Sequence, residues 1–126
     1  MEVDTGSSAG FTLIELIITI ILIGVLAAIA IPHYINLTTQ AQQTSTNNLA
    51  AALAASSAEN FAKRTANSSQ GAAVSDCTTT ASLLPAGSLP TGYTITSAAI
   101  TAGSAATCTL TGPSSVTATF RGLGIN

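Results

Sequence analysis

The sequence predicts an α+β fold, in which one long N-terminal helix spans a membrane with its first half and packs on a small antiparallel sheet of three to four strands with its second half. Three observations support this prediction. An apolar run extends from Phe11 to Ile31, an alanine-rich helical pattern extends from Thr38 to Ala66, and three short β-branched runs follow Gly92. Of the 126 residues, roughly 90 remain for one small head domain.

The predicted membrane segment contains one acid. The 21 residues from Phe11 to Ile31 would span about 31 Å as a helix, which matches the hydrocarbon thickness of a bilayer. Glu15 lies inside this run, where a carboxylate is costly unless it has a partner or a function. A cut after Gly10 would free the amine of Phe11 one helical turn before Glu15 and so provide a partner.

The residues around this position resemble a known processing motif. The sequence from Gly10 to about Tyr34, beginning Gly-Phe-Thr-Leu-Ile-Glu-Leu, is similar to the N-terminal signature of type IV prepilins and of the pseudopilins of type II secretion. The resemblance implies a pilin fold, removal of a leader (residues 1–10) by prepilin peptidase, and N-methylation of Phe11. It also implies that residues 11–32 form the transmembrane and filament-core helix and residues 33–126 the amphipathic helix and globular head.

Assembly is the expected role of four residues in this segment. In a filament, the Glu15 carboxylate of one copy should neutralise the Phe11 amine of a neighbour, because an unpaired charge in an apolar core is costly. Gly24 and Pro32 match a glycine and a proline between which the helix of type IV pili loses helicity on assembly. Proline removes a helical hydrogen bond, so a kink or local melt is expected before Pro32. An ordinary kinked membrane helix is the equal alternative for the free subunit.

A secretory signal peptide or a plain signal anchor is the alternative explanation of the apolar run. A signal peptide has a basic start, 7–15 apolar residues and a cleavage site after them. Here the run is longer, and the small residues Ser8 to Gly10 precede it. The leader also departs from prepilins, since it contains Glu2 and Asp4 but no Lys or Arg to orient the helix. Its orientation is then set by other factors, or the leader is unusual or not wholly native.

The second half of the helix is predicted to lay an apolar stripe under the sheet and to end at Asn67–Gly71. The stripe comprises Ala41, Leu49, Ala52, Leu53, Ala55 and Phe61. The opposite, polar side comprises Gln40, Gln43, Asn47, Asn48 and Ser57.

The predicted sheet is a three-stranded antiparallel meander. Its strands are Tyr93–Thr96, Ala106–Leu110 and Val116–Phe120, with turns at Ala102–Ser104 and Gly112–Ser114. Between helix and sheet, Asp76 is expected to cap a short helix that runs to Leu84 and stops at Pro85. Gly122–Gly124 is expected to be a flexible tail.

Cys77 and Cys108 are expected to form one disulfide, because an exported head lies in an oxidising compartment and two cysteines alone make no zinc site. Two buried free thiols are the alternative. The pairing differs from that of many type IV pilins, whose disulfide brackets a C-terminal loop. The head therefore looks like a short type, closer to pilins resembling the mannose-sensitive haemagglutinin class.

No group of residues in the sequence indicates an enzyme, a cofactor or a metal site. The single histidine, His33, has no carboxylate or cysteine at catalytic spacing and is expected to pack at the membrane interface. Nucleic-acid binding is not expected either, because it needs several basic residues on one face and only Lys63 and Arg64 are adjacent.

The function expected from the resemblance is that of a structural subunit of a type IV pilus, for adhesion, motility or DNA uptake. The alternative is a pseudopilin of type II secretion. Major pseudopilins bind calcium, which needs about 6–8 oxygen ligands; this chain has no acid beyond Asp76, which favours the pilus. The expected partners are copies of the chain, the inner membrane, prepilin peptidase and the pilus assembly machinery. The expected location is the inner membrane for the precursor and then the extracellular pilus.

Overall fold

The computed structural model of the chain describes residues 10–126, the side chain of Ile35 excepted. The expectations for Glu2, Asp4 and the rest of residues 1–9 therefore lie outside the described residues. The elements follow the order α1 (Leu13–Ala66), η2 (Cys77–Leu83), β1 (Thr94–Ile95), β2 (Ala105–Thr111), η3 (Pro113–Ser115) and β3 (Thr117–Leu123). The chain divides into two compact units with the boundary between Leu37 and Thr38.

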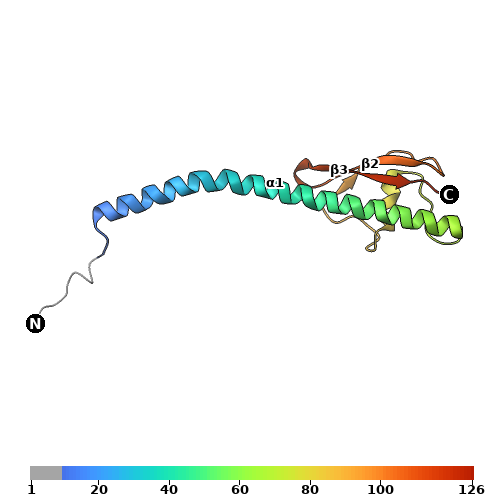
Figure 1. Cartoon of the computed structure of the whole chain (residues 1–126), viewed down its shortest axis with the longest axis horizontal. Helices are drawn as coiled ribbons and strands as arrows, with labels where there is room; N and C mark the ends of the chain where they lie inside the picture. Colours follow the sequence, from blue (N-terminus) through green and yellow to red (C-terminus); the bar gives the residue numbers. More distant parts are fainter. Residues whose placement is uncertain (1–9) are drawn as a thin grey trace, which may run out of the picture. The chain divides into compact units, whose positions relative to one another are not determined.

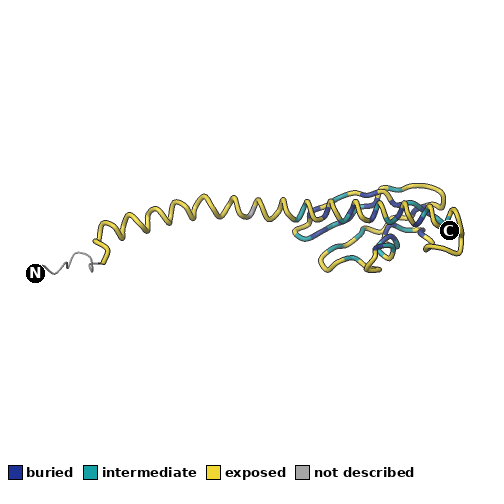
Figure 2. The backbone as a smooth tube through the Cα atoms, turned by 60° about the horizontal axis from the view of Figure 1, so that its bottom comes forward, coloured by how far each residue is buried: buried dark blue, intermediate teal, exposed yellow. Residues whose placement is uncertain are grey.

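The first unit contains the apolar half of α1. The helix is continuous through Gly24 and Pro32, so residues 24–32 are helical in this single chain. All the side chains described from Phe11 to Leu37 are exposed, as the uniform exposed colouring of this half in Figure 2 shows. Among the described residues, α1 is the one helix long and apolar enough to cross a membrane. Melting of this segment on assembly stays a prediction.

In the second unit, α1 packs on a three-stranded antiparallel sheet (Figure 1). The strands have the order β1-β2-β3, and Cys108 of β2 lies opposite Phe120 of β3. The predicted α+β fold and its meander are thereby confirmed. The strand bounds differ by one to three residues from the predicted ones, and β3 extends furthest beyond its prediction, from Phe120 to Leu123.

The buried face of α1 is not the predicted stripe. It comprises Thr46, Ala50, Leu53, Ser57 and Asn60, at alternating steps of four and three residues. Three residues of the predicted stripe are exposed: Ala41, Ala52 and Ala55. Alanine occurs on every side of this helix, so hydrophobicity alone distinguishes no face. Hydrogen bonding decides instead, because polar side chains on the buried face satisfy main-chain groups of the head.

Two of these polar side chains tie α1 to later parts of the chain. The hydroxyl of Ser57 accepts a hydrogen bond of 2.8 Å from the amide of Leu123 in β3. The side-chain amide of Asn60 binds both main-chain groups of Ala72, donating to the carbonyl at 2.9 Å and accepting from the N–H at 2.8 Å. Gly71, with φ +74°, makes this corner possible, because a side chain there would collide with Asn60.

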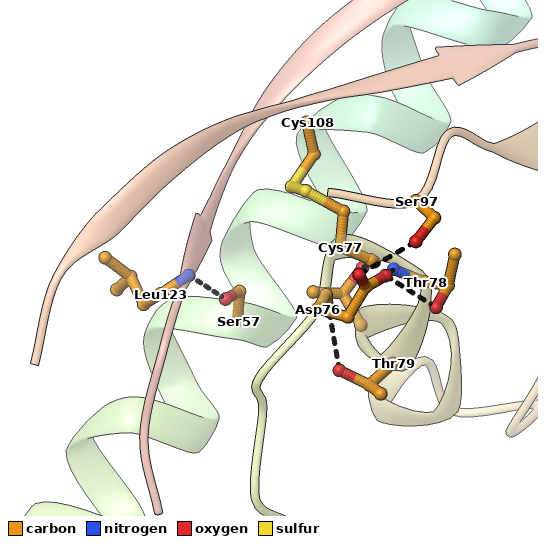
Figure 3. Close-up of a disulfide and its surroundings, with 9 residues drawn as sticks. Ser57, Asp76, Cys77, Thr78, Thr79, Ser97, Cys108 and Leu123 are labelled. Atoms are coloured by element: carbon orange, nitrogen blue, oxygen red, sulfur yellow. Dashed lines mark hydrogen bonds between the residues drawn. A yellow bond between two sulfur atoms is a disulfide. The ribbon is translucent and has the colours of Figure 1, made fainter. Parts of the chain in front are cut away.

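The core of the head is small and contains the disulfide. Its fully buried members include Leu53 from α1, Leu110 from β2 and Val74 from the connection, together with Cys77 and Cys108. The two cysteines are bonded, with 5.6 Å between their Cα atoms and 31 residues of sequence separation (Figure 3). The bond therefore fastens the start of η2 to the inner face of the middle strand.

The connection between helix and sheet begins with the predicted cap. Asp76 precedes η2, and its Oδ1 accepts hydrogen bonds from the amide and the hydroxyl of Thr78, both at 2.8 Å. Its Oδ2 accepts a third hydrogen bond, of 2.9 Å, from Ser97 (Figure 3). The amide hydrogen bond from Thr78, followed by the hydroxyl hydrogen bonds, holds the pKa of the Asp76 carboxyl below its ordinary value.

The prediction of a flexible tail at residues 122–124 is wrong. Gly122 lies in β3 opposite Ala106 and is buried, and the amide of Gly124 donates to the carbonyl of Ser104 at 2.9 Å. A Cβ at Gly122 would lie 2.8 Å from Ile100 and 2.9 Å from the Cys108 sulfur. Glycine is used here for close approach, not for flexibility.

Candidate processing and assembly segment

The junction between Gly10 and Phe11 lies outside any helix. Residues 10–12 have no regular secondary structure, and α1 begins at Leu13, two residues later than predicted. Gly10 is exposed, with no atom within 4 Å of the position a Cβ would take. The Phe11 side chain is 82% exposed. A peptide bond outside regular secondary structure and between exposed residues is accessible to a peptidase.

The start of α1 is fixed by Thr12 and Glu15. The Thr12 hydroxyl accepts from the Glu15 amide at 3.3 Å, and the Glu15 carboxylate accepts from the Thr12 amide at 2.9 Å. The Thr12 hydroxyl also donates to the same carboxylate oxygen, Oε2, at 2.8 Å. This reciprocal arrangement is a capping box, which satisfies two amide groups at the start of a helix. It accounts for the start of α1 at Leu13 rather than at Phe11.

Glu15 is the only acid or base of the Asp, Glu, Lys and Arg types between Gly10 and Ala58. Among the described residues, its Oε2 binds Thr12, whereas Oε1 has no hydrogen-bond partner and no cation lies within salt-bridge distance. The carboxylate is thus only half satisfied within the single chain. The Oε1 atom is therefore available to a cation from outside the described residues.

The surface around Glu15 is apolar. Large side chains from Phe11 to Leu37 are exposed to between 44% and 82% of their area. A continuous exposed surface of this kind exceeds what a soluble monomer presents and needs lipid or protein to cover it. Gly24 and Pro32 lie in the same helix, and a Cβ at Gly24 would meet no atom within 4 Å.

The other residues with site chemistry lie elsewhere. Cys77 and Cys108 belong to the second unit and hold the core of the head. His33 is exposed on α1. Lys63 forms an ion pair of 2.6 Å with Glu59. Within residues 10–126, no three His, Cys, Asp or Glu side chains gather as metal ligands would.

Comparison with known proteins identifies the segment. Residues 6–31 match the family model described as the prokaryotic N-terminal methylation motif. A stretch of 44 residues is 54% identical to the type IV narrow pilus major component PilA5 of Thermus thermophilus. The N-terminal segment therefore contains a prokaryotic N-terminal methylation motif and is similar to that of a type IV pilin. The recognition made from Gly10, Phe11 and Glu15 is thereby confirmed.

The extent of the type IV pilin match is limited. The aligned stretch covers 35% of this chain and 38% of the Thermus protein. No solved structure matches the chain. The head is therefore described by its own residues alone.

The sequence contains a pattern that predicts this capping box, although the sequence analysis above did not predict it. Thr12-Leu13-Ile14-Glu15 fits the pattern of a Ser or Thr followed three residues later by an acid, ahead of an apolar run. Glu15 belongs both to the prepilin-like motif and to this capping-box pattern, so one residue supports both predictions.

Proposed function

We propose that the mature chain is a structural subunit of a type IV pilus, which polymerises through the first half of α1 into an extracellular filament. The observation that carries this proposal is the arrangement of Gly10, Phe11 and Glu15. An accessible peptide bond lies just before the exposed apolar half of α1, in which Glu15, one helical turn away, is the one Asp, Glu, Lys or Arg residue. The N-terminal methylation motif fits both a pilin and a pseudopilin, and the name of the Thermus relative supports a pilus rather than a type II secretion pseudopilus.

Processing provides the charge that Glu15 lacks. Prepilin peptidase would cut after Gly10, remove residues 1–10 and N-methylate the new amine of Phe11. The Oε1 atom of Glu15, which has no partner among the described residues, would then accept from the Phe11 amine of a neighbouring copy. Because the pair neutralises both charges in an apolar surrounding, a subunit docked onto a neighbouring copy would be more stable than a single subunit in the membrane.

The exposed apolar residues from Phe11 to Leu37 would be covered first by lipid and later by other copies of the chain. In the precursor they would lie in the inner membrane, and in the pilus they would pack against the same segment of other copies. Residues 33–126 would then form the amphipathic helix and the head on the filament. Adhesion, motility and DNA uptake are the tasks such a pilus could serve.

The proposal is tested by blocking processing with Gly10→Val and measuring the intact mass of the product. We expect an uncut precursor in the inner membrane and no extracellular filaments, whereas the unaltered chain gives a methylated product beginning at Phe11. Gly24→Ala is the matched control, since a Cβ there also meets open space, and it should leave cleavage intact. If the subunits in filaments of the unaltered protein still began at Met1, the proposal would be refuted. Processed subunits without extracellular filaments, together with defective protein secretion, would indicate the pseudopilin.

A further inference from the structure

The edge strand β3 has main-chain groups that face away from the rest of the sheet. It is the last strand in the order β1-β2-β3. The amide of Gly124, just after β3, donates to the carbonyl of Ser104, and the register extends this bonding to the even-numbered residues of β3. In an antiparallel pair, the residues between such bonded positions direct their N–H and C=O groups away from the partner strand. The main-chain groups of Thr119 and Arg121 therefore point out from the sheet edge.

Helix α1 contacts this edge at both ends but not in its middle. The side-chain amide of Gln43 donates to the carbonyl of Thr117 at 2.8 Å. The hydroxyl of Ser57 accepts from the amide of Leu123 at 2.8 Å (Figure 3). Among the described residues, no hydrogen bond reaches the main-chain groups of residues 119 and 121 between these two contacts. Two N–H and two C=O groups thus remain, in the alternating order that a further strand would match.

A groove lies along the same part of the edge. Its volume is about 500 Å³, and it is lined by Asn47, Ala50, Ala51 and Ala54 of α1 and by residues 117–120. Three of the four helix side chains end in a single methyl group, which leaves room beside the strand. None of the lining side chains is charged. An occupant must therefore offer alternating main-chain donors and acceptors to β3 and uncharged side chains to α1, which is the chemistry of an extended polypeptide.

We infer that this groove binds an extended segment of a second copy of this chain, which adds a strand to the open edge of β3. The chain itself contains a matching partner, because the stretch from Cys77 to Phe120 has no Asp, Glu, Lys or Arg, whereas about a quarter of the residues of an average protein are charged. One wall of the groove also belongs to α1, the helix through which copies would polymerise. A groove on one copy and a different segment on the next form a heterologous contact, which can repeat along an open filament.

This inference rests on the proposed filament, and hydrogen exchange of individual amides tests it separately. We compare the processed subunit in detergent with filaments that contain this chain alone by mass spectrometry. The amides of Thr119 and Arg121 should exchange at least about tenfold more slowly in the filament. The amide of Phe120, at a position bonded to Cys108 of β2, should be protected in both samples and provides the reference.

Filaments in which the amides of Thr119 and Arg121 exchange as fast as in the subunit would overturn the inference and leave the pilus function in place. Slow exchange already in the single subunit would also overturn it, because the edge would then be covered without a second copy. Protection that appears only when another protein is present would assign the groove to that protein. Absence of filaments from the unaltered chain would instead reject the proposed function.

Proline substitution separates strand addition from general coverage of this surface. Thr119→Pro removes one outward N–H, and proline is tolerated on an edge strand at such a position, so the head should still fold. Filament yield should fall about fivefold or more, from the loss of one hydrogen bond at each contact. Thr119→Ala keeps the N–H and should give a normal yield.

Ala118→Pro is the contrasting variant. Ala118 lies at a position bonded to Leu110 of β2, so proline there should lower the melting temperature of the head itself. A normal filament yield from Thr119→Pro would contradict a bound strand. The exchange measurement on the unaltered chain needs no variant and still tests the inference if Thr119→Pro does not fold.

Discussion

Glu15 Oε2 accepts hydrogen bonds from both the amide and the hydroxyl of Thr12, at 2.9 and 2.8 Å, while Oε1 has no partner among the described residues. One residue can therefore serve two purposes at once. Oε2 completes the capping box of its own helix, and in the proposed filament Oε1 would bind the Phe11 amine of a neighbouring copy. This division of the carboxylate allows the two roles to be separated by substitution.

Glu15→Gln should keep the helix start but lose filaments. Glutamine also completes a capping box, so the precursor should insert and be processed normally. The neutral amide cannot cancel the charge of a Phe11 amine in an apolar core, so we expect filament numbers to fall strongly, and Glu15→Ala to abolish filaments. Pilus counts by negative-stain microscopy, beside the amount of processed subunit in the membrane, give the measurement.

Thr12→Val is the matched control for this prediction. It removes the capping hydroxyl, at a cost of about 1 kcal/mol of helix stability, but keeps the acid. Filaments should persist in this variant. If Glu15→Ala gave filaments of normal length and number, the assembly role of the carboxylate would have to be abandoned.

Removal of the Cys77–Cys108 bond should destabilise the head. The bond closes a loop of 31 residues, which corresponds to about 3.5–4 kcal/mol in the chain-entropy model. We expect a lower urea midpoint for the Cys77→Ser/Cys108→Ser double variant in detergent, measured by the tyrosine fluorescence of the chain, to which Tyr93 of the head contributes. The reduced native chain should behave like the double variant, and the double variant should not respond to reductant. Equal midpoints with and without the bond would show that it contributes little.

Gly122→Ala should be more harmful than an alanine substitution on the outer face of the same strand. The added methyl group would lie 2.8 Å from Ile100 and 2.9 Å from the sulfur of Cys108, and overpacking of this kind costs about 1–3 kcal/mol. Thr119→Ala, at an exposed position of β3, is the control and should change the melting temperature little. Thermal unfolding monitored by circular dichroism compares the two, and equal melting temperatures would contradict the close packing.

Acid should weaken the start of η2 through Asp76. Its pKa is lowered in the folded head from an ordinary value of 3.8, chiefly by the amide of Thr78. A depressed pKa gives stability that is present above the unfolded value and is lost as the pH falls through the folded value. We therefore expect the melting temperature to fall below about pH 4, and Asp76→Asn to remove this component. An unchanged acid profile in that variant would assign the loss to other carboxyls.

The sequence allowed much of the fold to be predicted. The apolar run and the alanine pattern predicted α1 and its end at Ala66 correctly, and alternation predicted the meander. The buried face of the helix could not be predicted, because alanine surrounds it and the choice of Ser57 and Asn60 depends on the distant amides of Leu123 and Ala72. Gly122 was misread for a similar reason, since its neighbour Ile100 is brought near by the fold.

The disulfide also determines what a protease can do to the head. Residues 85–88, in the loop after η2, are exposed, and such loops are preferred sites of nicking. They lie between Cys77 and Cys108, so a cut there leaves one sulfur on each fragment and the fragments stay joined. A cut in this loop would break the main chain without releasing a fragment. The two fragments of such a subunit would separate only after the disulfide is reduced.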